Sequence, residues 1–432
     1  MSFQQGLSGL NAASKNLDVI GNNIANSGTY GSKGSRAEFA DVYAAALNGA
    51  GQNQIGIGTT LSTVAQQFTQ GNISTTENPM DLAINGGGFF QVTDEVNPTR
   101  YTRNGQFKVS KDGYIVNNDG LKLMGYPANG AGVIQPGTAT PLQLPTGGIP
   151  PAVTSEVDME FNLDSRLAIT APASGAGMDL TDSTTYNNAT SMTVYDAKGQ
   201  DVAITFYFQK ASTAADGSDT WNVYATANGT PFAETAPDAN NPNLLTAPFT
   251  TITFPPTGGS PTSPAAPITM NVPAGFSARG NATLAIDGIQ LDLTGATENG
   301  SSFAVTNLTQ DGYAPGQLTG ITVANNGVVL ARYSNGQSKP AGQVELASFR
   351  NPQGLQTMGG NVWIRTVDSG DAVVGVPGDG NMGSLQSGAL EESNVDITAE
   401  LVNMVTAQRA YQASAQTIKT QDQVLQTIVN LR

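Results

Sequence analysis

Residues 389–432 have the sequence ALEESNVDITAELVNMVTAQRAYQASAQTIKTQDQVLQTIVNLR, without glycine or proline, although the chain contains 50 Gly and 23 Pro. Because these two residues are the main helix breakers, this stretch can form one long helix. Apolar or small side chains recur in it at alternating spacings of four and three, which is typical of a helix that packs against another helix. The Ser393–Asp396 sequence offers capping side chains and predicts a helix start near Asn394.

The first residues of the chain repeat this spacing, from Phe3 to Ile24. Gly6, Gly9 and Gly21 interrupt the pattern, and each costs about 1 kcal/mol relative to alanine inside a helix. We therefore expect this helix to form only against a partner, and the C-terminal helix is the obvious one. The predicted seam residues are Leu7, Leu10, Leu17, Ile20, Ile24, Ile397, Leu401, Met404, Tyr411, Ile418, Leu425 and Val429. Periodicity alone leaves open whether these seams pair within one chain or also join neighbouring chains.

Between the helical ends, glycine-bearing turns separate short strands. Asp112-Gly113, Asp119-Gly120, Lys198-Gly199 and Asn326-Gly327 predict hairpins, since apolar residues alternate on either side of them. A proline-rich run at residues 144–153 predicts a domain boundary. We therefore predict a mixed α and β, multidomain protein with paired, coiled-coil-like terminal helices and nested, mainly antiparallel β domains. The predicted parts are residues 1–29 with 393–432 (helical domain), 30–70 (connecting segment), 71–147 with 307–392 (inner β domain) and 148–306 (outer β domain, an insertion).

Composition argues against several classes of partner. Charged residues make up 12% of the chain, about half of the ~25% that is usual for soluble proteins. The net charge of −15 would repel phosphate backbones and anionic lipids, so we expect neither nucleic-acid binding nor membrane insertion. No apolar run approaches the ~18 residues of a membrane span. The first residues also lack the features of a secretory signal peptide, so we expect a cytoplasmic protein or one exported without a cleaved signal.

Composition also restricts catalysis. The chain contains no cysteine and no histidine, which excludes disulfides, thiolate or imidazole metal ligands and Ser-His or Cys-His nucleophiles. The G-x-G-x-x-G match at residues 378–383 lacks a following helix, because Gly388 interrupts it, so we predict a plain loop there. Paired carboxylates remain possible but carry no specific signal among 34 acidic residues. We predict no enzyme activity, no cofactor, no metal and no catalytic residue.

Both ends of the chain contain recognisable motifs. SGLNAASKNLDVIGNNIANSGTYGSK, at residues 8–33, and the sequence from Ser393 to Arg432 resemble the terminal motifs of bacterial flagellar rod and hook axial proteins. NPMDLAINGGGFFQV at residues 78–92, GYAPGQL at 312–318 and GGNVW at 359–363 are similar to the inner β domain of that family. The middle of the chain shows no alignable motif. Length and this large insertion favour the hook branch over the distal-rod branch of the family.

The resemblance implies a structural subunit of a curved tube that acts as a universal joint and transmits torque from rod to filament. It implies as partners other copies of the chain, the distal rod protein, the hook-filament junction protein, the hook cap and the flagellar type III export apparatus. The implied location is the extracellular hook of the bacterial flagellum. A distal-rod protein is one alternative. A secreted β-rich adhesin or fibre module is another, suggested by the Gly/Thr/Asn-rich centre, and a carboxylate-dependent glycosidase has only unspecific support.

Overall fold

The computed structural model describes residues 3–42, 56, 58–171, 177–239, 241–277 and 280–430. The chain forms two compact units. The first unit consists of Met1–Thr146, Thr319–Arg332 and Ser338–Arg432, and the second of Gly147–Leu318 and Tyr333–Gln337. The second unit is thus inserted into the first, and each has its own hydrophobic core.

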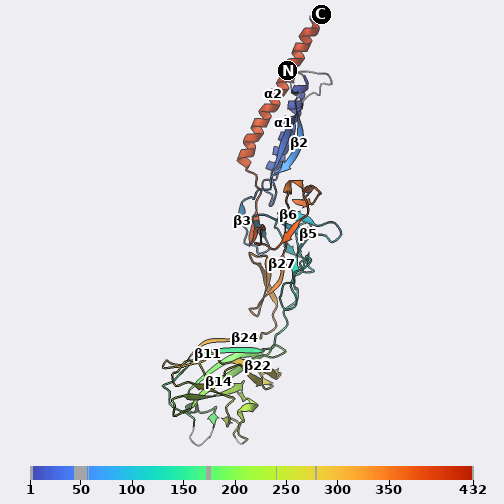
Figure 1. Ribbon diagram of the computed structural model, residues 1–432. Helices are drawn as coiled ribbons and strands as arrows, with labels where there is room; N and C mark the ends of the chain where they lie inside the picture. Colours follow the sequence, from blue (N-terminus) through green and yellow to red (C-terminus); the bar gives the residue numbers. More distant parts are fainter. Residues whose placement is uncertain are drawn as a thin grey trace. The chain divides into compact units, whose positions relative to one another are not determined.

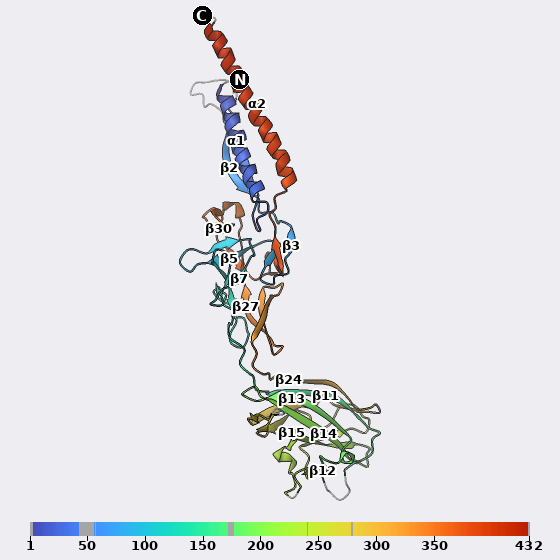
Figure 2. The same cartoon turned by 180° about the vertical axis from the view of Figure 1, so that it is seen from behind.

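Two helices form one end of the first unit. Helices α1 (Phe3–Ala25) and α2 (Ile397–Asn430) lie side by side and run in opposite directions, as Figures 1 and 2 show. The longer α2 continues beyond the N-terminal end of α1 in both views. Neither helix, within the described part of the chain, is both long and apolar enough to cross a membrane. The prediction of paired terminal helices is confirmed.

Most of the first unit is β structure. Its strands are β1 (Ser35–Val42), β2 (Gly58–Gln66), β3 (Ile73–Thr75), β4 (Leu82–Asn85), β5 (Phe89–Thr93), β6 (Arg100–Thr102), β7 (Lys108–Val109), β8 (Ile115–Val116), β9 (Lys122–Pro127), β10 (Thr140–Pro141), β25 (Leu318–Val323), β26 (Val328–Tyr333), β27 (Ser338–Val344), β28 (Leu346–Ser348), β29 (Gln356–Gly359), β30 (Val362–Ile364), β31 (Val373–Gly375), β32 (Ser384–Ser387) and β33 (Ala389–Glu391). The largest sheet has the main order β25-β26-β27-β9-β5-β6-β30-β29. In this order, the outgoing strands β9, β5 and β6 lie between strands of the returning half of the chain.

Two clusters of apolar side chains fill this β region. One centres on Leu82, Phe90 and Leu123, and all three are almost completely buried. The other is aromatic, with the Tyr101 and Phe349 rings packed edge to face at 4.7 Å between centroids. Such edge-to-face pairs add about 0.5–1.5 kcal/mol beyond the burial of their area. This packing gives the first unit a core that does not depend on the helices.

The predicted hairpin turns are present. Gly113 lies between β7 and β8, Gly120 between β8 and β9, and Gly327 between β25 and β26. Their φ angles are 83°, 79° and 81°, a left-handed conformation that glycine adopts without the steric cost of a Cβ. The Asp-Gly and Asn-Gly dipeptides therefore predicted these turns correctly, because the turns need a residue with positive φ. The G-x-G-x-x-G match also forms a loop, between β31 and β32.

The regular structure of the described part of the second unit is β strand, apart from two short 3-10 helices, Ser183–Thr185 and Ala233–Thr235. Its strands are β11 (Glu156–Asp164), β12 (Met178–Asp179), β13 (Asn188–Tyr195), β14 (Asp201–Thr213), β15 (Asp219–Ala227), β16 (Thr230–Pro231), β17 (Leu244–Leu245), β18 (Thr250–Phe254), β19 (Ile268–Val272), β20 (Gly275–Phe276), β21 (Ala282–Thr283), β22 (Ile286–Asp292), β23 (Thr297–Asn299) and β24 (Ala304–Gln310). Two five-stranded sheets contribute to one buried core around Phe161, Phe206 and Trp221. Strand β11 pairs in parallel with β22 and β23 and antiparallel with β24. The sheets are thus mainly antiparallel, as predicted.

The outgoing and returning segments of the chain are hydrogen-bonded to each other near the helices. Strand β3 pairs with β33, and β4 pairs with β32, both antiparallel. The segment predicted as a connection, residues 30–70, contains the hairpin β1–β2. Neither strand alternates apolar and polar residues regularly, so the sequence pattern did not predict this hairpin. Two strand pairs therefore join the outgoing and returning segments close to the helices.

Candidate functional site

The contact between α1 and α2 is made by small residues. A Cβ atom added at Gly6 would lie 2.9 Å from Ile418 Cγ1, and one at Gly9 would lie 3.0 Å from Ser414 Oγ. At the other end of the pair, Asn23 Nδ2 donates to Glu400 Oε1 at 3.2 Å. Two of the three glycines that weaken α1 as an isolated helix, Gly6 and Gly9, therefore permit its close approach to α2.

Helix α2 begins at Ile397, within one turn of the predicted start near Asn394. Asp396 is its cap, because Asp396 Oδ1 accepts from the Thr398 amide at 2.8 Å. Asn394 has another role: its Oδ1 accepts from the Gly34 amide at 2.8 Å and its Nδ2 donates to the Gln67 carbonyl at 2.7 Å. Side-chain caps of the Asp type stabilise a helix by about 1 kcal/mol. Two polar residues therefore fix where α2 starts and how it leaves the β region.

The predicted seam residues are mostly accessible in the single chain. Of the twelve, only Ile20 is buried. Leu10, Leu17, Ile24, Met404 and Ile418 are half-buried, and Leu7, Ile397, Leu401, Tyr411, Leu425 and Val429 are exposed. The residues that α1 buries are Gly6, Ala13, Ile20 and Asn23. The face that α1 buries in the single chain thus shares Ile20 with the predicted seam and otherwise consists of small or polar residues.

The β1–β2 hairpin packs along α1. Gln5 Nε2 donates to the Gly56 carbonyl at 2.8 Å, and Ser8 Oγ accepts from the Thr59 amide at 2.7 Å. Asn23 Oδ1 accepts from the Ser35 amide at 2.8 Å, while Asn23 Nδ2 donates to the Ser35 carbonyl, also at 2.8 Å. The hairpin and α2 together hold α1 along its whole described length.

A buried ion cluster joins the helices to the β region. Glu391 accepts from Lys33 Nζ at 2.5 Å and from Arg103 at 3.1 Å. It also accepts from the Gly71 amide at 2.9 Å. Burial lowers the pKa of Lys33 and of Arg103, and the Glu391 carboxylate opposes that shift. Sequence reasoning missed this cluster, since its members are separated by up to 358 residues.

The face of α2 directed away from α1 is apolar and exposed. Ile397, Leu401, Val402 and Val405 are each between 47% and 62% exposed. Exposed apolar residues that gather in one patch are typical of a surface that contacts another protein. No group of three or more acidic residues in the described part of the chain is arranged to hold a metal ion.

Family models cover most of the chain. Residues 3–33 match the model described as flagella basal body rod protein, and residues 386–431 match the flagellar basal body rod FlgEFG protein C-terminal model. Residues 83–197 match the flagellar hook protein FlgE/F/G D1 domain, and 162–313 the flagellar basal body protein FlaE D2 domain. Paired terminal helices and nested β units of this kind define a flagellar axial structural protein.

Relatives of full length narrow this class. The chain is 39% identical to the flagellar hook protein FlgE of Escherichia coli K12 and 40% identical to that of Salmonella typhimurium LT2, in each case over 100% of both chains. It is 31% identical to the Brucella suis protein of the same name, over 100% of this chain and 98% of the relative. The chain belongs to the flagellar hook protein family. The fold is also similar to the crystal structure of Helicobacter pylori flagellar hook protein FlgE2, with a TM-score of 0.51 at 15% identity, covering 74% of this chain and 100% of the other.

Proposed function

We propose that many copies of this chain polymerise into the curved tube of the flagellar hook, which joins rod to filament and transmits torque as a universal joint. The observation that carries this proposal is the match over 100% of both chains to two proteins named flagellar hook protein FlgE. It accounts for every part of the chain, including the inserted second unit. Both relatives are named flagellar hook protein, which supports a structural role for this chain rather than an enzymatic one.

The terminal helices are the proposed assembly elements. Six of the twelve predicted seam residues are exposed in the single chain, including Leu401 and Val429. Burying apolar surface contributes roughly 25 cal/mol per Å², so contact between these faces on neighbouring subunits would favour polymer over monomer. The exposed seam side chains would then be buried between subunits rather than within one subunit.

The remaining partners follow from the proposed place in the flagellum. The matches at residues 3–33 and 386–431 are to models named for basal body rod proteins, which supports contact of the first hook subunits with the distal rod protein through similar helices. The hook cap and the hook-filament junction protein would contact the growing and the finished end of the tube. We propose export through the flagellar type III apparatus in a largely unfolded form and assembly outside the cell.

A distal-rod protein is the second candidate from the same family. The match of residues 162–313 to the FlaE D2 domain and the full-length relatives favour the hook. The adhesin alternative has no support in any of these similarities.

Electron microscopy of purified protein under polymerising conditions tests this function. We expect hollow tubes from the wild-type chain and only monomers from a Leu401→Asp, Val405→Asp double variant, because charges on that face oppose its burial. Val367→Asp is the matched control, since Val367 is 98% exposed and lies outside the helices. Globular wild-type monomers under all conditions would contradict the proposal.

A further inference from the structure

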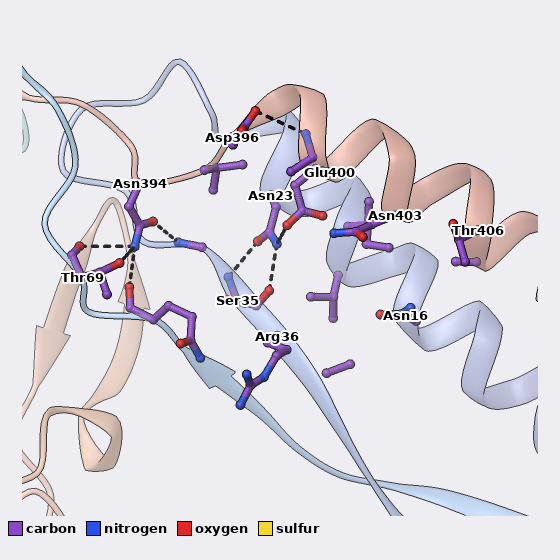
Figure 3. A pocket seen from close by; sticks show the side chains of 18 of the residues that line it. Asn16, Asn23, Ser35, Arg36, Thr69, Asn394, Asp396, Glu400, Asn403 and Thr406 are labelled. Atoms are coloured by element: carbon purple, nitrogen blue, oxygen red, sulfur yellow. Dashed lines mark hydrogen bonds between the residues drawn. The ribbon is translucent and has the colours of Figure 1, made fainter.

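A groove of about 620 Å³ lies among α1, α2 and the β1–β2 hairpin. Figure 3 shows its polar lining, to which Asn16 and Asn23 of α1, Ser35 and Arg36 of β1, and Glu400 and Asn403 of α2 contribute. It occupies the same end of the first unit as the proposed assembly surface. This groove differs from the exposed apolar face of α2 because about half of its lining surface is polar.

Two polar atoms of the groove residues lack a hydrogen-bond partner. Glu400 Oε2 and Gln67 Nε2 are both shielded from solvent and unpartnered. Leaving a buried donor or acceptor unpaired costs about 1–3 kcal/mol, and more for a charged group. The single chain therefore bears a cost at this groove that a suitable occupant would remove.

The Glu400 carboxylate also has no ion pair with a lysine or arginine side chain that the structure describes. Its Oε1 accepts from the neutral Asn23 amide, and the nearest groove cation, Arg36, is paired with Glu38 at 2.5 Å. Asp396 adds a second negative charge to the lining, with one oxygen committed to the helix cap. The groove thus favours a positively charged donor.

Helix α2 itself carries two such donors. Arg409 and Lys419 are exposed and make no ion pair or hydrogen bond with any residue that the structure describes. At 3.6 residues per turn, both lie on sides of α2 turned away from the groove residues Asn403 and Ala407. Neither can enter the groove of its own chain, but both are available to another chain.

We propose that the groove receives the Arg409 guanidinium of a second copy of this chain, which donates to Glu400 Oε2. This inference rests on the proposed polymer and specifies one contact within it. The Arg409 guanidinium suits the site better than the Lys419 ammonium for two reasons. Its planar fork can donate at once to the carboxylate and to the amide oxygen of Asn403 or Asn16, and a guanidinium is less strongly hydrated than an ammonium. Because Glu400 Oε2 is shielded from solvent in the single chain, the side chains around it must shift to admit the guanidinium.

A double-mutant cycle on full-length protein tests the contact. Glu400→Gln keeps the oxygen that accepts from Asn23 and removes the charge, and Arg409→Gln removes the donor. We expect each to raise the critical concentration for polymerisation by roughly tenfold or more, and the double variant to raise it no further than either single one. Lys419→Gln is the matched control on the same helix and should change it about twofold or less.

Cross-linking provides an independent readout. The chain has no cysteine, so an Asn403→Cys, Gln412→Cys variant introduces only one thiol in the groove and one beside Arg409. Oxidation should link subunits in the polymer and leave monomers unlinked. The far-ultraviolet circular dichroism of each monomer shows whether a variant still folds.

The outcomes separate this inference from the proposed function. Four results would each overturn the Arg409 contact and leave the hook function unaffected. These are normal tubes from Glu400→Gln protein, additive effects in the double variant, a larger effect of Lys419→Gln than of Arg409→Gln, and no cross-links in intact tubes. Failure of the wild-type chain to form tubes would instead overturn the function.

Discussion

Glu391 shows how single residues determine the stability of the first unit. It is 1% exposed and accepts from two buried cations, Lys33 and Arg103. Glu391→Gln should destabilise this unit by about 3–5 kcal/mol, because it leaves two buried charges uncompensated. Urea unfolding measures the loss. Glu38→Gln, which breaks an exposed pair with Arg36, should have almost no effect, and equal effects of the two variants would contradict the role of the cluster.

Glu298 makes the stability of the second unit depend on pH. It is 2% exposed, and its carboxylate accepts from Trp221 Nε1 at 2.9 Å. Burial, with the nearby charge of Asp219, raises the pKa of Glu298 to about 7 from its ordinary value of 4.5, while Lys210 opposes the shift. A raised carboxyl pKa means that the folded state holds the proton more tightly than the unfolded state. The resulting stability is complete below pH 4.5 and is lost as the pH rises through 7.

The thermal midpoint of the second unit should therefore fall by several degrees between about pH 5 and pH 8. Glu298→Gln removes the titrating proton and should flatten this slope. Calorimetry at several pH values measures both proteins. An equally steep slope in the variant would show that another group is responsible.

Among the elements, the contact of α1 with α2 depends on glycine. Gly6→Val should force the helices apart, since even a Cβ would lie 2.9 Å from Ile418, and amide hydrogen exchange along α1 should accelerate. Gly21→Ala is the matched control, because no atom lies within 4 Å of the added Cβ. It should stabilise α1 by up to about 1 kcal/mol through helix propensity. Protection of α1 that survives Gly6→Val would contradict this packing.

The elements also show what could be predicted from the sequence. Local signals were sufficient for the hairpins at Gly113 and Gly327 and for the breaker-free α2, since backbone preferences act over a few residues. The heptad rule expects large apolar residues in a helical seam, so it did not select Gly6 and Ala13. Lys33 and Glu391 each resemble solvated surface residues in isolation, and only the folded chain brings them together.

At the scale of the whole molecule, the two units have separate cores. We expect two calorimetric transitions, as is common for proteins of more than one domain. Glu391→Gln should lower one of them, and Glu298→Gln should alter the pH dependence of the other. A single transition that responds to both variants would mean that the units unfold together.

We expect the terminal helices to join subunits and the β units to fold without them. Sedimentation and calorimetry of the full chain and of a variant lacking Ser393–Arg432, under the same polymerising conditions, test it most directly. The full chain should sediment as tubes, whereas the truncated chain should stay soluble with the melting transitions of its β units retained. Tubes formed by the truncated chain, or the loss of its β transitions, would contradict the account.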